Sequence, residues 1–250
     1  MAQNNYLKLQ DQRNVKLKYS KELESHIHKM KGRSYTDAYR LNDFYHPLFE
    51  FKLKQNNLPH EFKYLPILES KMDYLAVSRA DAKGLWQIIP GTGFELGLLE
   101  SKCISNYFDP LAATHYATSY LKWLYDRTND FNMTLAAYNW GIGNVLKLIK
   151  TKGTKDFYKL KESMPEETRN YIFNFHAIVF LAESNYFNYK KIQFNYKNVV
   201  KIKINKKYSI DELKTLFSDF KFLNPQFLCD TISKNSLIYV KKKELKKLNK

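Results

Sequence analysis

Glu69 is the acidic residue of this chain whose surroundings best suit acid–base chemistry. It follows the apolar segment Leu65-Pro66-Ile67-Leu68 at the end of an expected helix. A carboxyl group that is partly buried there holds its proton to a higher pH, because desolvation disfavours the charged form. Such a group can donate its proton to a leaving oxygen and later take one back. The alternative is an ordinary exposed glutamate at a helix end, and the residue by itself does not decide between the two.

Further polar residues lie at defined distances from Glu69. Ser78 follows nine positions later, and Gly84-Leu85-Trp86-Gln87 follows at fifteen to eighteen positions. Ala137-Tyr138-Asn139 and Glu167-Thr168-Arg169-Asn170-Tyr171 come further along. Hydroxyl and amide groups can hydrogen-bond a polar ligand, and a tyrosine ring has a flat apolar face and a polar tip. Each residue also has a structural interpretation: core packing for the tyrosines, a turn for the serine, and a wall or core position for the tryptophan.

Together these segments resemble the four motifs of the lytic transglycosylases of the lysozyme superfamily: Glu-Ser, Gly-Leu-Met-Gln, Ala-Tyr-Asn and a late Tyr. The membrane-bound D branch of that family is the most similar. Its catalytic helix opens with Leu-Pro-x-Glu, here Leu58-Pro59-His60-Glu61, and it has Trp in the second motif and Glu-Thr-x-x-Tyr in the last. The resemblance covers roughly residues 40–187, and residues 196–240 more weakly.

The resemblance implies roles for the residues near the first two motifs. Glu69 would act as the single catalytic acid and then as the base. Ser78 and Gln87 would hold the sugar and its N-acetyl group at the bond to be cleaved. Gly84 would let the backbone approach a bulky glycan, because glycine has no side chain there.

The later motifs would complete the site. Tyr138 and Asn139 would shape it around the sugar and the carboxylate, and Tyr171 would lie near Glu69 and orient it. Two features depart from the family pattern. Trp140 replaces a small residue and could narrow the groove, and residues 78–83 are more charged than usual.

The number of carboxylates bears on the mechanism. Most glycosidases use two, an acid together with a base or nucleophile. Asp73 and Asp81 lie outside the motifs and are expected to be surface charges. The resemblance then implies an intramolecular reaction at the bond between N-acetylmuramic acid and N-acetylglucosamine. Glu69 would protonate the bridging oxygen and then deprotonate the muramyl C6 hydroxyl, which forms a 1,6-anhydro end without water. No cofactor or metal is expected.

Composition predicts a globular, mainly α-helical protein. Of the 250 residues, 44% are apolar and 26% charged, with 8 Gly and 7 Pro. A loop-rich all-β protein needs more turn residues than this. The longest unbroken apolar run, residues 177–182, has six residues. A membrane-spanning helix needs roughly 20, so none is expected.

Three regions are expected along the chain. Residues 14–57 form an N-terminal helical extension, and residues 58–187 form a lysozyme-like catalytic domain of the soluble lytic transglycosylase type. This domain opens with a helix over 58–70 that is kinked at Pro66. Residues 196–245 form a small α+β module in the order strand, helix, helix, strand. Ser209 and Glu212 fit a capping box at its first helix, and the tail from Lys241 is expected to be frayed.

The C-terminal module resembles LysM modules, which would make it a glycan-binding adaptor; a purely structural extension is the alternative. Net charge is +16, and residues 190–250 hold 16 Lys against 5 acids. Such a surface attracts anionic partners, including nucleic acid and cell wall. Only 6 Arg are present, which argues against specific nucleic-acid recognition. The expected partner is the glycan strand of peptidoglycan.

The cellular location of the protein and the state of its two cysteines follow less directly from the sequence. Met1-Ala2-Gln3-Asn4-Asn5 opens a polar stretch with no secretory signal, so a periplasmic or envelope location is expected from the substrate. A peripheral or lipid-anchored membrane association of a full-length precursor is compatible with the resemblance. Cys103 and Cys229 are too few for a disulfide scaffold. Two free buried thiols are the favoured expectation, and pairing is left open.

Two other functions stay open. One is a non-catalytic cell-wall binding or scaffold protein that keeps the fold without turnover. The other is a hydrolytic lysozyme of the same fold, which needs a second carboxylate to activate water.

Overall fold

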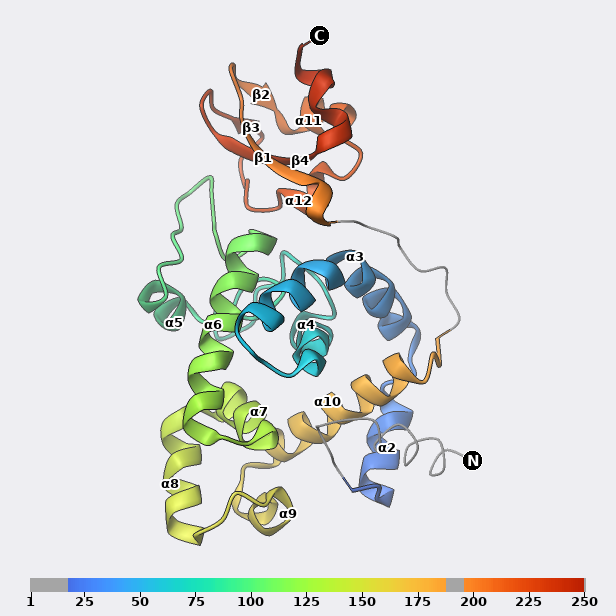
Figure 1. Ribbon diagram of the computed structural model, residues 1–250, viewed down its shortest axis with the longest axis vertical. Coiled ribbons are helices and arrows are strands. Elements are labelled where there is room, and N and C mark those ends of the chain that lie inside the picture. The colour runs from blue at the N-terminus through green and yellow to red at the C-terminus, as the bar shows by residue number, and fades with distance from the viewer. Residues whose placement is uncertain (1–17, 188–195, 250) are drawn as a thin grey trace.

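The computed structural model describes residues 18–187 and 196–249 (Figure 1). The expectation for the chain's first residues, and the start of the helical extension at residues 14–17, lie outside the described residues. None of the described helices combines the length and the apolar character needed to cross a membrane.

The body of the protein is helical, as predicted. Its elements are α2 (Lys21–Lys29), α3 (Arg33–Gln55), the 3-10 helix η1 (His60–Tyr64), α4 (Leu65–Ser70), α5 (Pro90–Glu95), α6 (Pro110–Thr128), α7 (Phe131–Trp140), α8 (Ile142–Lys152), α9 (Phe157–Leu160), the 3-10 helix η2 (Lys161–Ser163) and α10 (Glu166–Glu183). The short helix α4 lies near the centre of the body in Figure 1, and α3 and α10 both pack against it.

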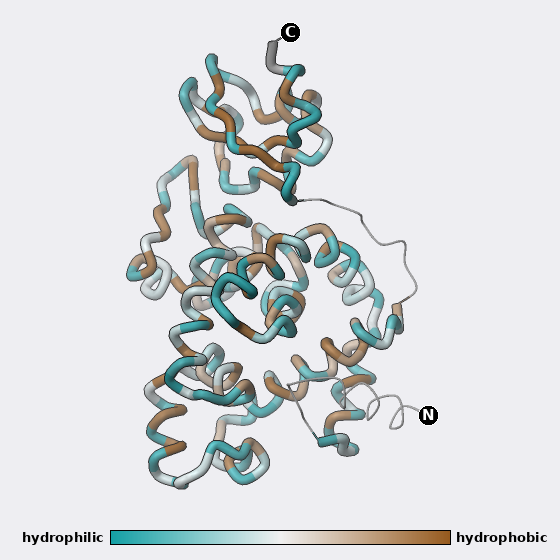
Figure 2. The backbone as a smooth tube through the Cα atoms, in the orientation of Figure 1, coloured by the Kyte–Doolittle hydropathy of each residue, from teal (hydrophilic) through white to brown (hydrophobic). Residues whose placement is uncertain are grey.

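Helix α10 is the main core element. It packs against α2, α4 and α7, and brown apolar stretches run along it in Figure 2. Phe173, Phe175 and Ile178 are fully buried on it. The same core takes in Leu23 of α2 and Phe49 of α3. Burial of several large side chains, each worth about 1.5–3 kcal/mol, therefore holds α10 and the helices around it in fixed positions.

A smaller α+β module follows at the C-terminus, seen at the top of Figure 1. Its elements are the 3-10 helix η3 (Tyr196–Asn198), β1 (Val199–Lys203), β2 (Tyr208–Ser209), α11 (Ile210–Leu216), α12 (Phe220–Leu223), β3 (Thr231–Ile232), β4 (Leu237–Lys241) and the 3-10 helix η4 (Lys242–Asn249). β1 pairs with β4 in antiparallel register, with Val199 opposite Lys241 and Lys203 opposite Leu237. The predicted order of strand, helix, helix, strand is present, together with an additional short β2–β3 pair.

Two sequence predictions for this module have different outcomes. The capping box of its first helix is confirmed, and the frayed tail at its end is not. Ser209 accepts a hydrogen bond from the Glu212 backbone, and the Glu212 side chain accepts one from the Ser209 backbone, which completes the capping box. The expectation of a frayed tail from Lys241 is wrong, because η4 begins at Lys242. The Nζ of Lys247 bonds the Leu216 carbonyl oxygen at 2.7 Å and so ties η4 back to α11.

The module is bonded to the helical body. The Tyr45 hydroxyl donates to the Phe222 carbonyl oxygen at 2.7 Å, and the Tyr239 hydroxyl lies 3.3 Å from Asp109 Oδ2. Leu223 and Tyr239 belong to the same core as the helices of the body. The module is therefore packed against the body by hydrogen bonds and by shared apolar contacts.

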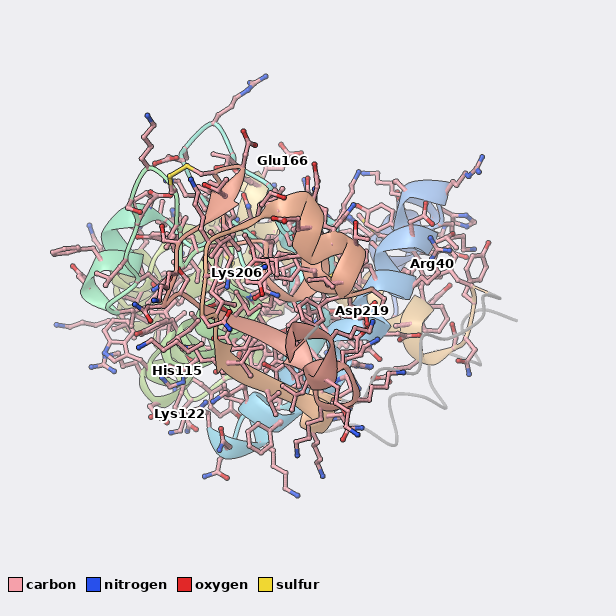
Figure 3. All side chains as sticks on the ribbon, turned by 90° about the horizontal axis from the view of Figure 1, so that it is seen from above. Arg40, His115, Lys122, Glu166, Lys206 and Asp219 are labelled. Carbon is pink, nitrogen blue, oxygen red and sulfur yellow. A yellow bond between two sulfur atoms is a disulfide. The ribbon has the colours of Figure 1, made fainter. Side chains whose placement is uncertain are left out.

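Cys103 and Cys229 form a disulfide between the loop before α6 and the module, so the expectation of two free thiols is wrong. Figure 3 looks down on the module and shows this disulfide as a yellow bond. Backbone bonds flank it: the Leu228 amide donates to the Cys103 carbonyl at 2.9 Å, and the Ser105 amide donates to the Gln226 carbonyl at 3.0 Å. The cysteines are 126 positions apart, and only the fold brings them together.

Candidate active site

Glu69 lies at the end of α4. The expected single helix over residues 58–70 is wrong: a 3-10 turn ends at Tyr64, and α4 begins at Leu65. Pro66 stands in the first turn of α4, where the missing N–H has no intrahelical partner to lose. The Ser70 hydroxyl lies 3.0 Å from the Leu85 carbonyl oxygen and 3.1 Å from the Pro66 carbonyl oxygen. These contacts connect the end of α4 to the segment that carries the second motif.

Two opposing effects set the proton affinity of Glu69. The residue keeps part of its surface exposed, but protein atoms surround the carboxyl group, and this desolvation raises its pKa to about 7. The Tyr171 hydroxyl, from α10, donates a hydrogen bond to Oε1 of Glu69. That bond lowers the pKa and opposes the effect of burial. The carboxyl group can therefore be both a proton donor and a proton acceptor near neutral pH.

Tyr138 and Tyr171 both stay protonated at neutral pH. Burial raises the pKa of each well above its ordinary value, and the negative charge of Glu69 raises both further. The Tyr138 hydroxyl donates to the Trp86 carbonyl oxygen at 2.6 Å, which joins α7 to the second motif. Trp86 is fully buried, and its Nε1 donates to the Thr114 hydroxyl at 3.0 Å. Trp86 is therefore a core residue, which agrees with the structural interpretation of its position in the sequence.

Asn139 is oriented by α10. The Thr168 hydroxyl donates to Oδ1 of Asn139 at 2.9 Å, so the third and fourth motifs are in direct contact. Thr168 received no role from the sequence. A signal for it exists, because it lies three positions before Tyr171 on one helix, and such positions share a face. Trp140, the departure from the family pattern, is partly buried and packs against the core.

Gln87 lines a small cavity of about 40 Å³ together with Tyr120 and Tyr138. Its Nε2 donates to the Gly84 carbonyl oxygen at 2.9 Å and to the Ala76 carbonyl oxygen at 3.3 Å. These two bonds hold its side chain in place. Tyr120 on α6 was also missed by the sequence reasoning; its ring centre lies 5.9 Å from that of Tyr138. Its only sequence signal was a position in the apolar repeat of that helix.

Gly84 and Ser78 have mainly local structural contacts. Gly84 is buried with φ +72°, and an added Cβ would lie 2.3 Å from the Tyr107 carbonyl oxygen. The structure thus gives this glycine a reason of its own, the close approach of the Tyr107 backbone. The expected approach of a glycan at Gly84 stays a prediction. The Ser78 oxygen accepts the amides of Ala80 at 3.2 Å and Ala82 at 3.0 Å, which closes the loop. The structure describes no contact of either residue with Glu69.

Within the parts of the chain that the structure describes, no second carboxylate influences the pKa of Glu69. Asp73 is exposed and caps the Leu75 amide at 2.9 Å. Asp81 is exposed and pairs with Lys83 at 3.5 Å. In residues 18–187 and 196–249, no three His, Cys, Asp or Glu side chains are grouped as a metal site requires. The arrangement therefore offers one carboxyl group of raised pKa between two neutral tyrosines.

Comparison with known proteins agrees with this geometry. Residues 47–161 match the family described as Transglycosylase SLT domain. This range holds Glu69, Gln87, Tyr138 and Asn139, and ends before Tyr171. The matched segment, which carries the site, is similar to the lytic transglycosylases of the lysozyme-like superfamily.

The chain is also similar in sequence to two curated proteins. The chain is 39% identical over 126 residues to "Membrane-bound lytic murein transglycosylase D" of Escherichia coli (strain K12), a match covering 48% of this chain and 27% of that protein. It is 28% identical over 121 residues to "Putative tributyltin chloride resistance protein" of Alteromonas sp. (strain M-1), covering 47% of this chain and 58% of that protein. The chain thus spans only about a quarter of the length of the first relative.

Two solved structures overlay in part. A 70 kDa soluble lytic transglycosylase from Escherichia coli gives a TM-score of 0.49 at 26% identity, covering 55% of this chain and 24% of that one. An inactive mutant of lytic transglycosylase Slt from Pseudomonas aeruginosa gives 0.47 at 23% identity, covering 55% and 24%. The similarity of this chain to lytic transglycosylases rests on the sequence matches.

Proposed function

We propose that this chain cleaves the β-1,4 bond between N-acetylmuramic acid and N-acetylglucosamine in peptidoglycan, with Glu69 as the single general acid and base. The observation that carries the proposal is the environment of Glu69: a carboxyl group with a pKa of about 7, bonded to Tyr171. The relative from Escherichia coli is named as a murein transglycosylase, which supports the same polymer as the substrate.

The proposed reaction has two proton transfers. Protonated Glu69 gives its proton to the bridging oxygen, and the bond from that oxygen to the muramyl C1 breaks. The Glu69 carboxylate then takes the proton of the C6 hydroxyl of the same sugar while that oxygen bonds to C1. Atoms balance without water, and Glu69 ends protonated. A nucleophile within the same sugar also has the advantage of proximity.

The surrounding residues have distinct proposed roles. Tyr171 stabilises the carboxylate formed between the two steps, since a hydrogen bond to the charged form favours that form. Tyr138 and Gln87 line one cavity, and the charge of Glu69 acts on Tyr138. Both residues are proposed to hold the sugar and its acetamido group, together with Asn139. Ser78 and Gly84 shape the loop that carries this wall.

Location and the C-terminal module complete the proposal. Disulfides persist in oxidising compartments, so the Cys103–Cys229 bond supports an envelope or periplasmic location. The paired strands β1 and β4, with two helices between them, support a LysM-like interpretation of the module. Membrane association of a longer precursor is part of the proposal through the name of the relative.

Digestion of purified peptidoglycan followed by mass spectrometry tests this proposal. The proteins compared are the wild type, Glu69→Gln and Glu95→Gln, the last carrying an exposed acid on α5. We expect the wild type and Glu95→Gln to release fragments lighter by one water than lysozyme products, and Glu69→Gln to release none. Hydrated ends from the wild type would indicate a hydrolase. Retention of the wild type on insoluble wall with no release would indicate a binding protein.

A further inference from the structure

A second cavity, of about 370 Å³, lies between the segment after α4 and the C-terminal module. Tyr74 and Leu75 line it from the body, and Lys214, Lys221 and Leu228 line it from the module. Its volume falls within the range of about 300–1,000 Å³ that is usual for small-molecule sites. No residue of the proposed catalytic site lines it.

The walls of this cavity are held in place from both sides. The Cys103–Cys229 disulfide joins the body to the residue next to Leu228. Ile104 and Phe227 form an antiparallel bridge beside it, and the ring of Tyr74 meets the ring of Phe222 edge-on at 5.9 Å. The cavity is therefore preformed, which spares a ligand the cost of ordering its walls.

The lining combines positive charge with exposed apolar surface. Lys221 is exposed and has no carboxylate partner among residues 18–187 and 196–249. Lys214 pairs with Asp211 at 3.0 Å, but that aspartate is 90% exposed, so the pair is weak. Leu75 is 47% exposed and Leu228 43% exposed. This combination suits a ligand that carries carboxylates next to short apolar groups.

The cavity and the proposed catalytic site share one segment of chain. Residues Tyr74 and Leu75 follow Glu69 by five and six positions. The next residue, Ala76, accepts a hydrogen bond from Nε2 of Gln87. The segment that lines the cavity is therefore continuous with Glu69 and is bonded to Gln87 of the proposed catalytic site.

We propose that this cavity is an accessory subsite for the acidic peptide stem that peptidoglycan carries on its muramic acid residues. The proposal rests on the proposed function, because that function names the polymer. The glycan backbone is made of neutral N-acetylated sugars joined to lactyl-linked peptides, and the free carboxylates and alanine methyl groups belong to the stems. Two ammonium groups beside apolar side chains match the stem better than the sugar.

Binding of soluble fragments to the full chain tests this subsite, and Glu69→Gln serves as the background so that no cleavage occurs. The two probes are a disaccharide–tetrapeptide and the same disaccharide with its lactyl carboxyl group capped as a primary amide, so that only the first carries free carboxylates. Binding is measured by titration calorimetry. We expect the peptide-bearing probe to bind about tenfold tighter, as one or two charge-assisted hydrogen bonds predict. Raising the salt concentration should weaken that preference, because exposed charges are screened.

Charge reversal supplies the decisive comparison. The double substitution Lys214→Glu and Lys221→Glu changes two exposed side chains and keeps the disulfide. We expect it to abolish the preference, while Lys234→Glu, exposed on the same module outside the cavity, keeps it. Equal binding of both probes by the Glu69→Gln protein, or an unchanged preference in the double variant, overturns the subsite and leaves the proposed function standing. Failure of both probes to bind contradicts the proposed function itself.

Discussion

Replacing Glu69 by glutamine is expected to stabilise the protein at neutral and alkaline pH. The pKa of Glu69 is about 7 in the folded chain against an ordinary value of 4.5. Between these values the folded chain binds more protons than the unfolded chain. The free energy of unfolding therefore falls as pH rises from about 4.5 to about 7, because ionisation of the surrounded carboxyl group costs energy only in the folded state.

The magnitude follows from the size of the pKa difference. A gap of about 2.5 pH units at 1.36 kcal/mol each gives about 3 kcal/mol as the upper value. Glutamine keeps an oxygen that can accept the hydrogen bond from Tyr171 and carries no charge at any pH. We expect Glu69→Gln to match the wild type near pH 4 and to exceed it by up to about 3 kcal/mol at pH 8.

Urea unfolding at a series of pH values measures this difference directly. The difference between the two proteins cancels the titration of all groups that they share. Glu95→Gln is the matched control for the loss of one carboxyl group, since Glu95 is exposed. If the Glu69→Gln difference is flat from pH 4 to pH 8, the Glu69 carboxyl group is not desolvated, and the physical basis of its acid role is lost.

Three further substitutions test other parts of the structure. Tyr171→Phe removes the hydrogen bond that lowers the pKa of Glu69, so we expect the pH–rate profile to shift upward and the rate at pH 7 to fall about tenfold, as for loss of a charge-assisted bond. Replacing Cys103 and Cys229 by serine opens a link across 126 positions, and we expect a loss of about 4 kcal/mol in urea unfolding, with the wild type behaving the same way in reductant. Gly84→Ala forces a Cβ to 2.3 Å from a backbone oxygen at φ +72°; we expect a loss of at least about 2 kcal/mol by thermal unfolding, and an unchanged melting temperature would show that the loop has room to move.

The helical class and the local signals were readable from the sequence because they depend on neighbouring residues. The capping box at Ser209 and Glu212 is one example, and the two strands Val199–Lys203 and Leu237–Lys241 are another. The contacts of Pro66 were misjudged, since the residue lies at the start of a short helix and not inside a long one. The spacing of apolar residues over 58–70 does not distinguish a proline at the start of a short helix from a proline inside a long one.

Long-range contacts were beyond what the sequence could supply. The Cys103–Cys229 pair depends on docking of the module, and the Thr168–Asn139 bond depends on how α10 crosses α7. Gly84 shows the same limit in another form. The sequence marked a glycine that was needed, but the partner in its close approach, the Tyr107 carbonyl group, comes from the loop before α6. Which residues gather at Glu69 was expected from family resemblance, and the raised pKa needed the folded surroundings.

The central claim is that Glu69 drives an intramolecular reaction in which water takes no part. Digestion of peptidoglycan in water enriched in oxygen-18, followed by mass spectrometry of the new muramyl ends, tests it most directly. The account predicts anhydro ends that carry no heavy oxygen, formed by the wild type and absent with Glu69→Gln. Heavy oxygen at the muramyl C1 of the primary products would show that water attacks that carbon, and would contradict the mechanism proposed for this site.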